Sequence, residues 1–440
     1  MVRRAAAFAL AVFLLLGLTG CSVFSVQNVN DLLRAPALSP GQDEIRKALN
    51  SYLGGLEPQY KFPKGGDWLS PMLQADLNGD GKDEAMLLYS VADDVNAASE
   101  RGTNVNVAVL ERADGTWTVT GDIVGRNTEV ASIEVADLLD DGTRQLLVGY
   151  ASAKLTSRVL SVYTYTGAGL TEAFSFEYSR YEIGDFSGQG ASELVVVSST
   201  TTPGDLQLYY IHAKGGELVG GAAEAVSLGA NSVSCVNIAP SASAAGEHLM
   251  VVDVMVTGEQ LASQLLIFSE DHFYPWEGFD TTVSNTIISQ TSRENSLLIS
   301  RDIDGDGIVE IPLRGSDVNI ITTLRGDKNM EYVDWWDFTA VESTPVIKQF
   351  GVADYDRAAY IRLPEAWRES IQVVDGAGAG EWNIINRQTM ATLVSLHVAR
   401  AGDNVPPDAR PVPGNPDTYL QYHGGLSAAD REIITVTALS

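Results

Sequence analysis

The feature that most constrains this chain is an internal repeat, a nine-residue acidic loop with glycines that runs directly into a short apolar segment. Recognisable copies begin at Asp76, Asp137, Asp185 and Asp302. The first reads DLNGDGKDE and the last DIDGDGIVE, whereas the second (DLLDDGTRQ) and third (DFSGQGASE) depart from this pattern. A repeat of this kind constrains the fold more than local propensity does, because each unit buries its core against its neighbours.

The spacing of the copies predicts the size of one unit. The first three loops start 61 and 48 residues apart, and the next recognisable loop starts 117 residues further on. The long gap has room for a degenerate copy, with Asn237 at its first position, Glu247 near its acidic end and Met250–Val256 as its strand. We therefore expect five copies of roughly 50 to 65 residues, a length that suits four short antiparallel strands.

The segments between the loops alternate strand-like runs with turn residues. Asn104–Arg112 and Thr116–Ile123 are rich in Val, Thr and Trp and are separated by an Asp-Gly turn. The same order follows the next two loops, in Arg158–Thr166, Leu170–Tyr178, Leu206–Ala213 and Glu217–Gly221. Radial repetition of small sheets protects their edges. We therefore predict a mainly β fold, a β-propeller of about five or more four-stranded blades over residues 59–340.

The loops and the strands that follow them resemble the FG-GAP, or VCBS-type, repeats of integrin-like β-propellers, over about residues 60–340. The match is specific in the first and last copies. It is looser in the second loop, where Leu139 replaces a ligand, and in the third, where Ser187 and Gln189 do so. The whole chain also resembles bacterial lipoproteins that carry such repeats. For that family the resemblance implies a fold and a location, and no activity.

The loop chemistry predicts calcium binding independently of the resemblance. Oxygens at loop positions one, three, five and nine, with the backbone carbonyl at position seven, can surround Ca²⁺, which takes about six to eight oxygens. An EF-hand is excluded because its bidentate glutamate belongs at position twelve, where this chain has Leu87 and Leu313. The expected ligands are Asp76, Asn78, Asp80, the Lys82 carbonyl and Glu84 in the first loop, and Asp302, Asp304, Asp306, the Ile308 carbonyl and Glu310 in the last.

The second and third loops are weaker candidates for metal, because each lacks at least one carboxylate ligand. The third, for example, offers Asp185, Ser187, Gln189 and Glu193. In the alternative interpretation, all of these loops are Asp/Asn/Gly turns whose side chains bond their own backbone. Where metal binds, we expect its role to be structural, since clustered carboxylates repel one another until a cation neutralises them.

The amino terminus predicts export and lipidation. A short basic region precedes the apolar stretch Ala5–Leu18, which has the length of a signal peptide and is short for a membrane span. The stretch ends in LTGC, which resembles the bacterial lipobox, in which Cys21 carries the lipid; an ordinary signal peptide with a chance cysteine is the alternative. We expect a signal peptide at 1–20, a tether at 21–40 and a palmitate-bearing anchor on the extracytoplasmic face of the cell membrane.

Charge and cysteine content limit the partners. The 440 residues carry 57 acidic and 29 basic side chains, a formal net charge of −28, so the net field repels nucleic acid and anionic head groups. Cys235 is expected to be a small buried apolar residue, because the only other cysteine is Cys21. The expected partners are the membrane, through Cys21, and an unidentified protein or glycan at the cell surface, with no nucleic acid.

The two ends of the chain depart from the repeat. Pro40–Leu53 carries apolar residues at helical spacing, so residues 41–58 are expected to form a short helical segment. Beyond the last repeat, short strand-like runs, a proline-rich loop at Pro406–Pro416 and a serine-capped helix at Ser427–Ile434 predict a small C-terminal α+β domain over residues 341–440.

No catalytic motif emerges from the sequence. The five histidines are scattered without metal-ligand spacing, and the segment around Ser187 is not a nucleophile elbow. An aromatic cluster at Tyr332, Trp335, Trp336 and Phe338 is typical of a core, with stacking on a sugar as the alternative. Two function classes follow, a non-enzymatic binding, adhesion or assembly module and a carbohydrate-active enzyme such as a polysaccharide lyase. The absence of a His/Tyr/Arg constellation in the sequence favours the first.

Overall fold

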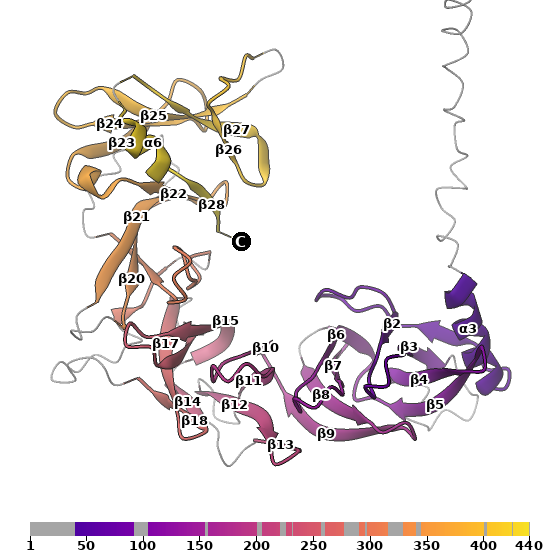
Figure 1. Ribbon diagram of the computed structural model, residues 1–440. Coiled ribbons are helices and arrows are strands. Elements are labelled where there is room, and N and C mark those ends of the chain that lie inside the picture. Colours follow the sequence, from indigo (N-terminus) through magenta and orange to yellow (C-terminus); the bar gives the residue numbers. More distant parts are fainter. Residues whose placement is uncertain are drawn as a thin grey trace, which may run out of the picture.

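The structure is a computed structural model in which six antiparallel sheets follow one another along the chain. It describes residues 40–91, 104–154, 157–199, 205–220, 226–230, 232–256, 260–276, 290–294, 297–315, 329–339, 345–399, 403–424 and 426–439. Figure 1 shows the sheets along an open arc, with the first and last sheets at its two ends. The fold is thus mainly β and β-propeller-like, as predicted, and the described sheets do not close into a ring.

The first four sheets are four-stranded meanders, two of which carry one additional strand. Sheet 1 contains β2 (Met72–Ala75), β3 (Glu84–Val91), β4 (Asn106–Ala113) and β5 (Thr116–Val124), with β1 (Pro58–Tyr60) also paired to β3. Sheet 2 contains β6 (Glu129–Ala136), β7 (Gln145–Ala151), β8 (Arg158–Tyr165) and β9 (Leu170–Glu177). Sheet 3 contains β10 (Arg180–Gly184), β11 (Glu193–Ser199), β12 (Asp205–Lys214) and β13 (Glu217–Val219), with β14 (Val226–Ala230) on β12. Sheet 4 contains β15 (Ser232–Ala242), β16 (His248–Val256), β17 (Gln260–Ser269) and β18 (His272–Pro275).

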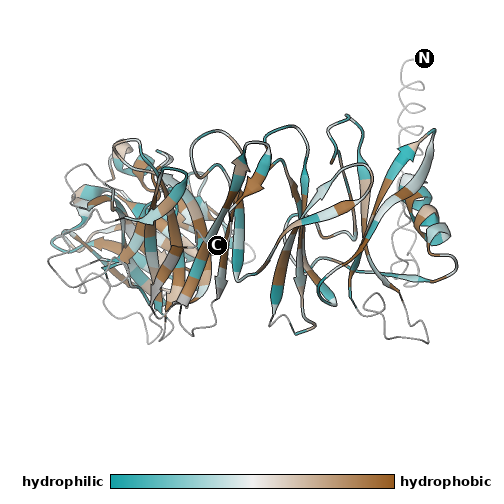
Figure 2. Ribbon diagram, turned by 90° about the horizontal axis from the view of Figure 1, so that it is seen from below, coloured by the Kyte–Doolittle hydropathy of each residue, from teal (hydrophilic) through white to brown (hydrophobic). Residues whose placement is uncertain are grey.

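The first strand of each of these sheets lies on the concave side of the arc and the last on its convex side (Figure 1). The second strands are the most buried, and every residue of β3 and of β7 is buried. A strand covered on both faces reads as a continuous apolar run, which explains why each acidic loop runs into one. Apolar clusters fill the space between neighbouring sheets, and Figure 2 shows the hydrophobic segments concentrated in the strands.

The amino-terminal helix covers the outer face of sheet 1. It is α3 (Pro40–Tyr52), which agrees with the predicted helical segment. Ile45 and Leu49 lie one turn apart and are fully buried against sheet 1, together with Trp117. The helix therefore shields the first end of the array. No helix among the described residues has the length and apolar character that a bilayer-spanning segment needs.

The predicted domain boundary after residue 340 lies inside a sheet. Sheet 5 contains β19 (Ile311–Arg314), β20 (Met330–Asp337), β21 (Val346–Asp354), β22 (Ala359–Leu363) and β28 (Val436–Ala438), and β20 pairs with β21 across the boundary. Sheet 6 contains β23 (Ile371–Asp375), β24 (Trp382–Asn386), β25 (Thr392–Val398), β26 (Arg410–Val412) and β27 (Asn415–Tyr422). The last strand of the chain returns to β22, so the C-terminal residues complete sheet 5 as well as forming sheet 6.

Two details of the C-terminal prediction have different outcomes. The helix α6 (Ala428–Ile433) begins with the expected cap, in which Ser427 and Asp430 form a reciprocal capping box. The segment Pro406–Pro416, predicted as a loop, instead contains the short strand β26 and the start of β27. Proline is tolerated here because β26 is the edge strand of sheet 6.

Candidate metal centre at the acidic loops

The acidic loops occupy the same position in their sheets, as the repeat predicts. The first three join β2 to β3, β6 to β7 and β10 to β11. The fifth precedes β19 and is closed by a β-bridge between Arg301 and Glu310. Glycines at the fourth and sixth positions of the fifth loop, Gly305 and Gly307, adopt φ of +83° and +87°. This left-handed backbone is readily accessible only to glycine, and it lets the loop wrap around its own acidic side chains.

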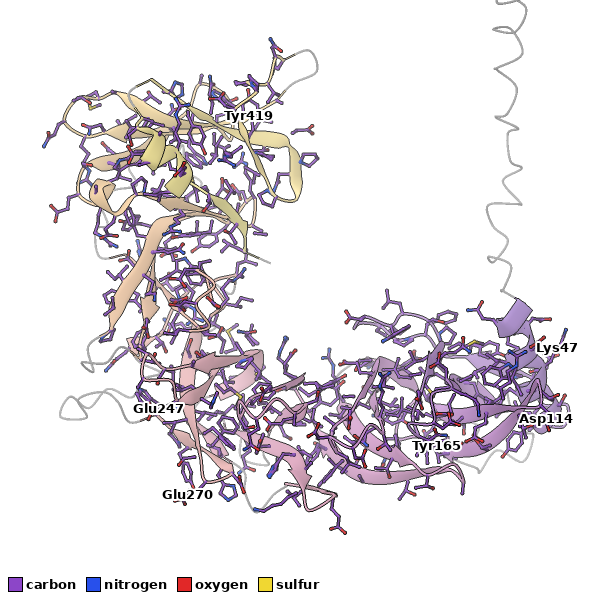
Figure 3. All side chains as sticks on the ribbon, viewed as in Figure 1. Lys47, Asp114, Tyr165, Glu247, Glu270 and Tyr419 are labelled. Carbon is purple, nitrogen blue, oxygen red and sulfur yellow. The ribbon has the colours of Figure 1, made fainter. Side chains whose placement is uncertain are left out.

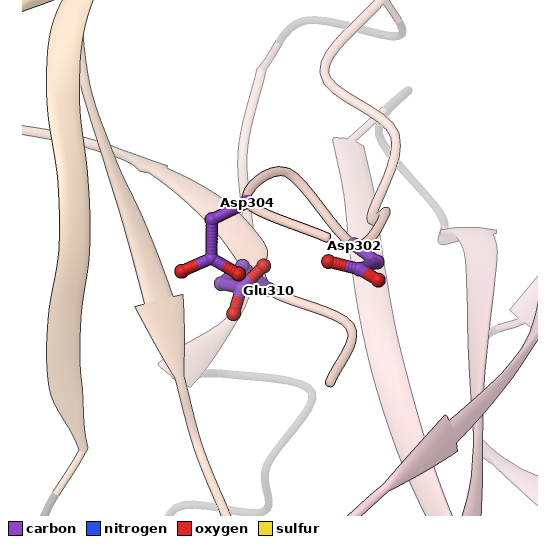
Figure 4. Close-up of side chains that lie close together, drawn as sticks. All are labelled: Asp302, Asp304 and Glu310. Atoms are coloured by element: carbon purple, nitrogen blue, oxygen red, sulfur yellow. The ribbon is translucent and has the colours of Figure 1, made fainter. Parts of the chain in front are cut away.

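The fifth loop brings three carboxylates together. Asp302, Asp304 and Glu310 each offer an oxygen, and these three oxygens lie within 4.8 Å of one another (Figure 4). Among the residues that the structure describes, no other three His, Cys, Asp or Glu side chains meet in this way. Hard oxygen ligands at this spacing suit Ca²⁺.

Glu310 is the least satisfied ligand of this loop. Its side chain is fully buried, and Oε2 accepts a hydrogen bond of 3.0 Å from the Ile303 backbone N–H. The other oxygen, Oε1, is buried without a hydrogen-bond partner among the described residues. Burial, with a further contribution from the charges of Asp304 and Asp306, raises the pKa of Glu310 to about 8. A buried carboxylate oxygen with no donor is costly, and a cation in the loop would remove that cost.

The other acidic side chains of the fifth loop are partly engaged. Asp302 accepts hydrogen bonds from the backbone N–H groups of Gly305 and Gly307. Lys348, from β21, reaches across to this loop, and its Nζ lies 2.5 Å from Asp306 Oδ2 and 3.7 Å from Asp304 Oδ2. The ammonium compensates part of the carboxylate charge, and it must move away from Asp306 if that residue is to bind metal. No feature of the loop sequence indicated the participation of Lys348.

The first loop has the predicted residues, but its acidic side chains already accept hydrogen bonds from donors within the loop. Glu84, at position nine, accepts from the Leu77 N–H at 2.8 Å and from the Asn78 side-chain amide at 3.2 Å. Lys82 Nζ lies 3.4 Å from Asp80 Oδ2. Asp76 accepts from two backbone N–H groups of its own loop, whereas Asp302 accepts from three. For this loop to hold a cation, the Asn78 amide must turn its oxygen toward Glu84, so the fifth loop is better prepared for metal.

The second and third loops are hydrogen-bonded turns in which protein donors stand where a cation would. In the second, position nine is Gln145, whose amide Nε2 is itself a donor and bonds to Thr143 Oγ1 at 3.3 Å. In the third, both oxygens of Glu193 are occupied, and the donors include the Ser187 N–H and the Tyr210 hydroxyl at 2.6 Å. The ring of His248 also packs on Gly188, where an added Cβ would lie 1.8 Å from it.

The degenerate fourth loop is shorter than expected. Residues 243–247 join β15 to β16, and Ser243 Oγ donates to Glu247 Oε2 at 3.1 Å. Figure 3 labels Glu247, the last residue of this connection. The predicted strand Met250–Val256 is confirmed as part of β16. Asn237, placed at the first loop position from the sequence, instead lies inside the eleven-residue strand β15, where it donates to the Ser300 carbonyl. That assignment was wrong because β15 extends further than its counterparts.

The structure also shows the burial of three other residues that were singled out from the sequence. Trp335 is fully buried and Tyr332 nearly so, which confirms the core interpretation of that aromatic cluster. Cys235 is a buried free thiol, and burial raises its pKa to about 12, as expected for an inert side chain. Cys21 lies outside the described residues.

No protein-family model matches the sequence, and no curated protein sequence matches it. Solved structures align with it at low identity and low TM-score. Saccharomyces cerevisiae Sqt1 aligns with 9% identity over 74% of this chain and 88% of its own, with a TM-score of 0.29. An exo-β-1,3-galactanase from Phanerochaete chrysosporium aligns with 10% identity over 87% and 91%, with a TM-score of 0.26, and the Aleuria aurantia lectin with 11% over 77% and 93%, with a TM-score of 0.23. Similarity at this level supports no conclusion about function.

Proposed function

We propose that this protein is an extracytoplasmic lipoprotein, anchored in the bacterial cell membrane through Cys21, whose β-propeller-like array of FG-GAP/VCBS-type repeats is a non-enzymatic binding, adhesion or assembly module. The signal-peptide pattern and the LTGC motif support the anchor. The array supports the binding role, because stacked sheets present a long concave surface that a ligand can contact at several places. The partner is a protein or a glycan.

Calcium is part of this proposal, and the observation that carries it is the partnerless buried oxygen of Glu310 beside Asp302 and Asp304. Asp302, Asp304, Asp306, the Ile308 carbonyl and Glu310 would hold the ion, which would supply the positive charge that the loop lacks. The loop also touches sheet 4, because the Ala242 N–H donates to the Gly307 carbonyl at 3.1 Å and the Val309 N–H to Ser241 Oγ at 2.9 Å. An ion that orders this loop therefore stabilises the junction between sheets 4 and 5.

An enzymatic role has less support from the geometry. A Ser–His hydrogen bond is present in sheet 6, where Ser395 Oγ lies 2.7 Å from His423 Nε2. Ser395, however, is only 3% exposed, and its hydroxyl also contacts Asn383 on the neighbouring strand. A nucleophile must reach its substrate, so this pair is better explained as a cross-strand polar contact.

The anchor has a direct test. With a palmitate analogue supplied to cells, the wild-type chain should become labelled and should sediment with the membrane fraction. Cys21→Ala should abolish the labelling and release the chain from the membrane, because no other residue can accept the lipid. Cys235→Ala, which changes the buried cysteine, is the matched control and should label normally. Label that persists in the Cys21→Ala variant would show that the lipobox interpretation is wrong.

A further inference from the structure

A pocket of about 390 Å³ lies between sheets 2 and 3. Its floor is made by β6 and β10, the first strands of these sheets, which face the concave side of the arc (Figure 1). One wall is the segment around Lys64, which continues the sheet beyond β6 because the Lys64 and Gly65 N–H groups donate to the carbonyls of Val130 and Ala131. The volume lies within the usual range for small-ligand sites, about 300–1,000 Å³.

The pocket gathers basic side chains in an acidic chain, although one of them, Lys64, also forms an ion pair of 3.4 Å with Glu129. Lys64, Arg158 and Arg180 line it, against two acidic residues, Glu134 and Glu182, although the chain as a whole has 57 acidic and 29 basic side chains. Arg158 is exposed and forms no ion pair with any described residue. A guanidinium group left free at the edge of a pocket is suited to bidentate binding of a carboxylate.

Arg180 is also incompletely engaged. Its only ion pair among the described residues is a long one, 3.5 Å from NH2 to Glu182 Oε2, and its buried Nε has no hydrogen-bond partner there. Burial raises the pKa of Glu182 above its usual value, and a contact of 3.5 Å is at the long limit of a charge-assisted hydrogen bond. Both arginines can therefore turn toward an anionic ligand without breaking a strong contact.

The rest of the lining is a fixed row of hydrogen-bonding groups. The Tyr181 hydroxyl donates to Glu134 Oε1 at 2.7 Å and lies 2.7 Å from Ser132 Oγ. The edge of the Tyr178 ring packs against Tyr181, with centroids 5.3 Å apart. Besides this row, the lining holds the rings of Tyr178 and Tyr181 and two aliphatic side chains, those of Ala131 and Ile183. The alternating donors and acceptors match the hydroxyl groups of a sugar.

We propose that this pocket binds an acidic oligosaccharide, with the carboxylate of a uronic acid residue on Arg158 and Arg180 and its ring hydroxyls on the Ser132–Tyr181–Glu134 row. The inference rests on the proposed binding function and names the ligand class for it.

The same geometry indicates binding without cleavage. A lyase needs a base that removes the proton next to the carboxylate. Burial and the adjacent Glu134 charge hold the pKa of Tyr181 well above its usual value, and its proton is already donated to Glu134. Tyr181 therefore orients Glu134 and the ligand and is unsuited to accept a proton at neutral pH.

The test is calorimetric titration of the full chain with tetramers of galacturonic, glucuronic and mannuronic acid, each compared with the neutral tetramer of the parent sugar. At least one acidic tetramer should bind, and its neutral counterpart should bind at least about tenfold more weakly, since contacts to a charged group carry most of the discrimination. Arg158→Ala and Arg180→Ala should each weaken binding of the acidic tetramer by about tenfold or more. Arg144→Ala, an exposed arginine outside the pocket, is the matched control and should bind as wild type does.

Three results would overturn the inference: no acidic tetramer binds, the arginine variants bind as tightly as Arg144→Ala, or a glutamate tetrapeptide binds as tightly as the sugar. The last would assign the pocket to acidic peptides. None of these outcomes affects the anchor or the calcium loop. Release of an unsaturated product from a bound tetramer would confirm the ligand class but would contradict the non-enzymatic part of the proposed function.

Discussion

Asp253→Ala should lower the free energy of unfolding of the sheet 4–sheet 5 region by about 3–5 kcal/mol, the usual cost of leaving a buried charge without its partner. Asp253 Oδ1 lies 2.8 Å from the Arg293 guanidinium, and the two side chains are 0% and 2% exposed. The carboxylate also accepts from the Ser300 N–H at 2.6 Å and from the Ser263 hydroxyl. Removing it leaves a buried guanidinium and a buried backbone donor unsatisfied.

The loss of stability in Asp253→Ala should be local, because Arg293 joins the residues before the fifth loop to sheet 4. Its remaining donors bond the Leu298 and Thr291 carbonyls, and its backbone forms a β-bridge with Leu261 of β17. These contacts fasten the described residues before the fifth loop onto sheet 4. We expect faster hydrogen exchange in β16 and β17 and new protease sensitivity near Arg293, while sheets 1 and 2 keep their wild-type protection.

Urea unfolding followed by hydrogen exchange would measure this effect. Glu44→Ala is the matched control, because it removes a carboxylate from an exposed ion pair, 3.4 Å from Arg112, and such pairs contribute at most about 1 kcal/mol. A double change, Asp253→Val with Arg293→Met, should cost less than Asp253→Ala alone, since it leaves no buried charge. If Asp253→Ala and Glu44→Ala have the same unfolding midpoint, the network does not carry the stability assigned to it.

The strands were predictable because their burial determines the pattern of apolar residues in the sequence. β3 and β7 are covered on both faces, so they read as apolar runs, and each follows an acidic loop that marks its start. The boundary predicted after residue 340 was misplaced because that motif marks only one strand of a sheet. Nothing equivalent marks β21 as the partner of β20, and sheet 6 has no acidic loop to indicate a further repeat.

Whether the acidic side chains of each loop have hydrogen-bond partners was less predictable, because some of the donors come from distant parts of the sequence. Glu84 and Glu310 occupy the same loop position, yet an amide donates to Oε1 of the first, and no donor among the described residues reaches Oε1 of the second. Tyr210 reaches the third loop from β12, and Lys348 reaches the fifth from β21. Such contacts link residues 17 and 42 positions apart, and no pattern within nine residues reports them. The pocket between sheets 2 and 3 was missed for the same reason, because its arginines belong to β8 and β10.

Calcium should raise the melting temperature of the protein relative to chelator. A ligand that binds only the folded state stabilises it by mass action, by about 2.7 kcal/mol at one hundred times its dissociation constant. Mg²⁺ should raise the temperature less, because it requires a smaller octahedral shell and gives up water reluctantly. Asp306→Ala should remove most of the calcium effect and Asp80→Ala a smaller part, since the first loop already satisfies its glutamate. Asp141→Ala in the second loop is the control and should leave the shift unchanged.

Glu310→Gln provides a second test of the calcium site, because its expected effect on the melting temperature has opposite signs in chelator and in calcium. In chelator, at a pH above the Glu310 pKa of about 8, the variant should melt at a higher temperature than wild type, because it removes a buried carboxylate whose Oε1 has no hydrogen-bond partner among the described residues. The second loop shows that the amide fits, since Gln145 at the equivalent position accepts from Leu138 N–H as Glu310 accepts from Ile303 N–H. In calcium the order should reverse, because the variant lacks the ligand that the ion needs. Scanning calorimetry of both proteins in both conditions decides the matter, and a wild-type midpoint that is the same in calcium and in chelator would mean that these loops are hydrogen-bonded turns without a structural ion.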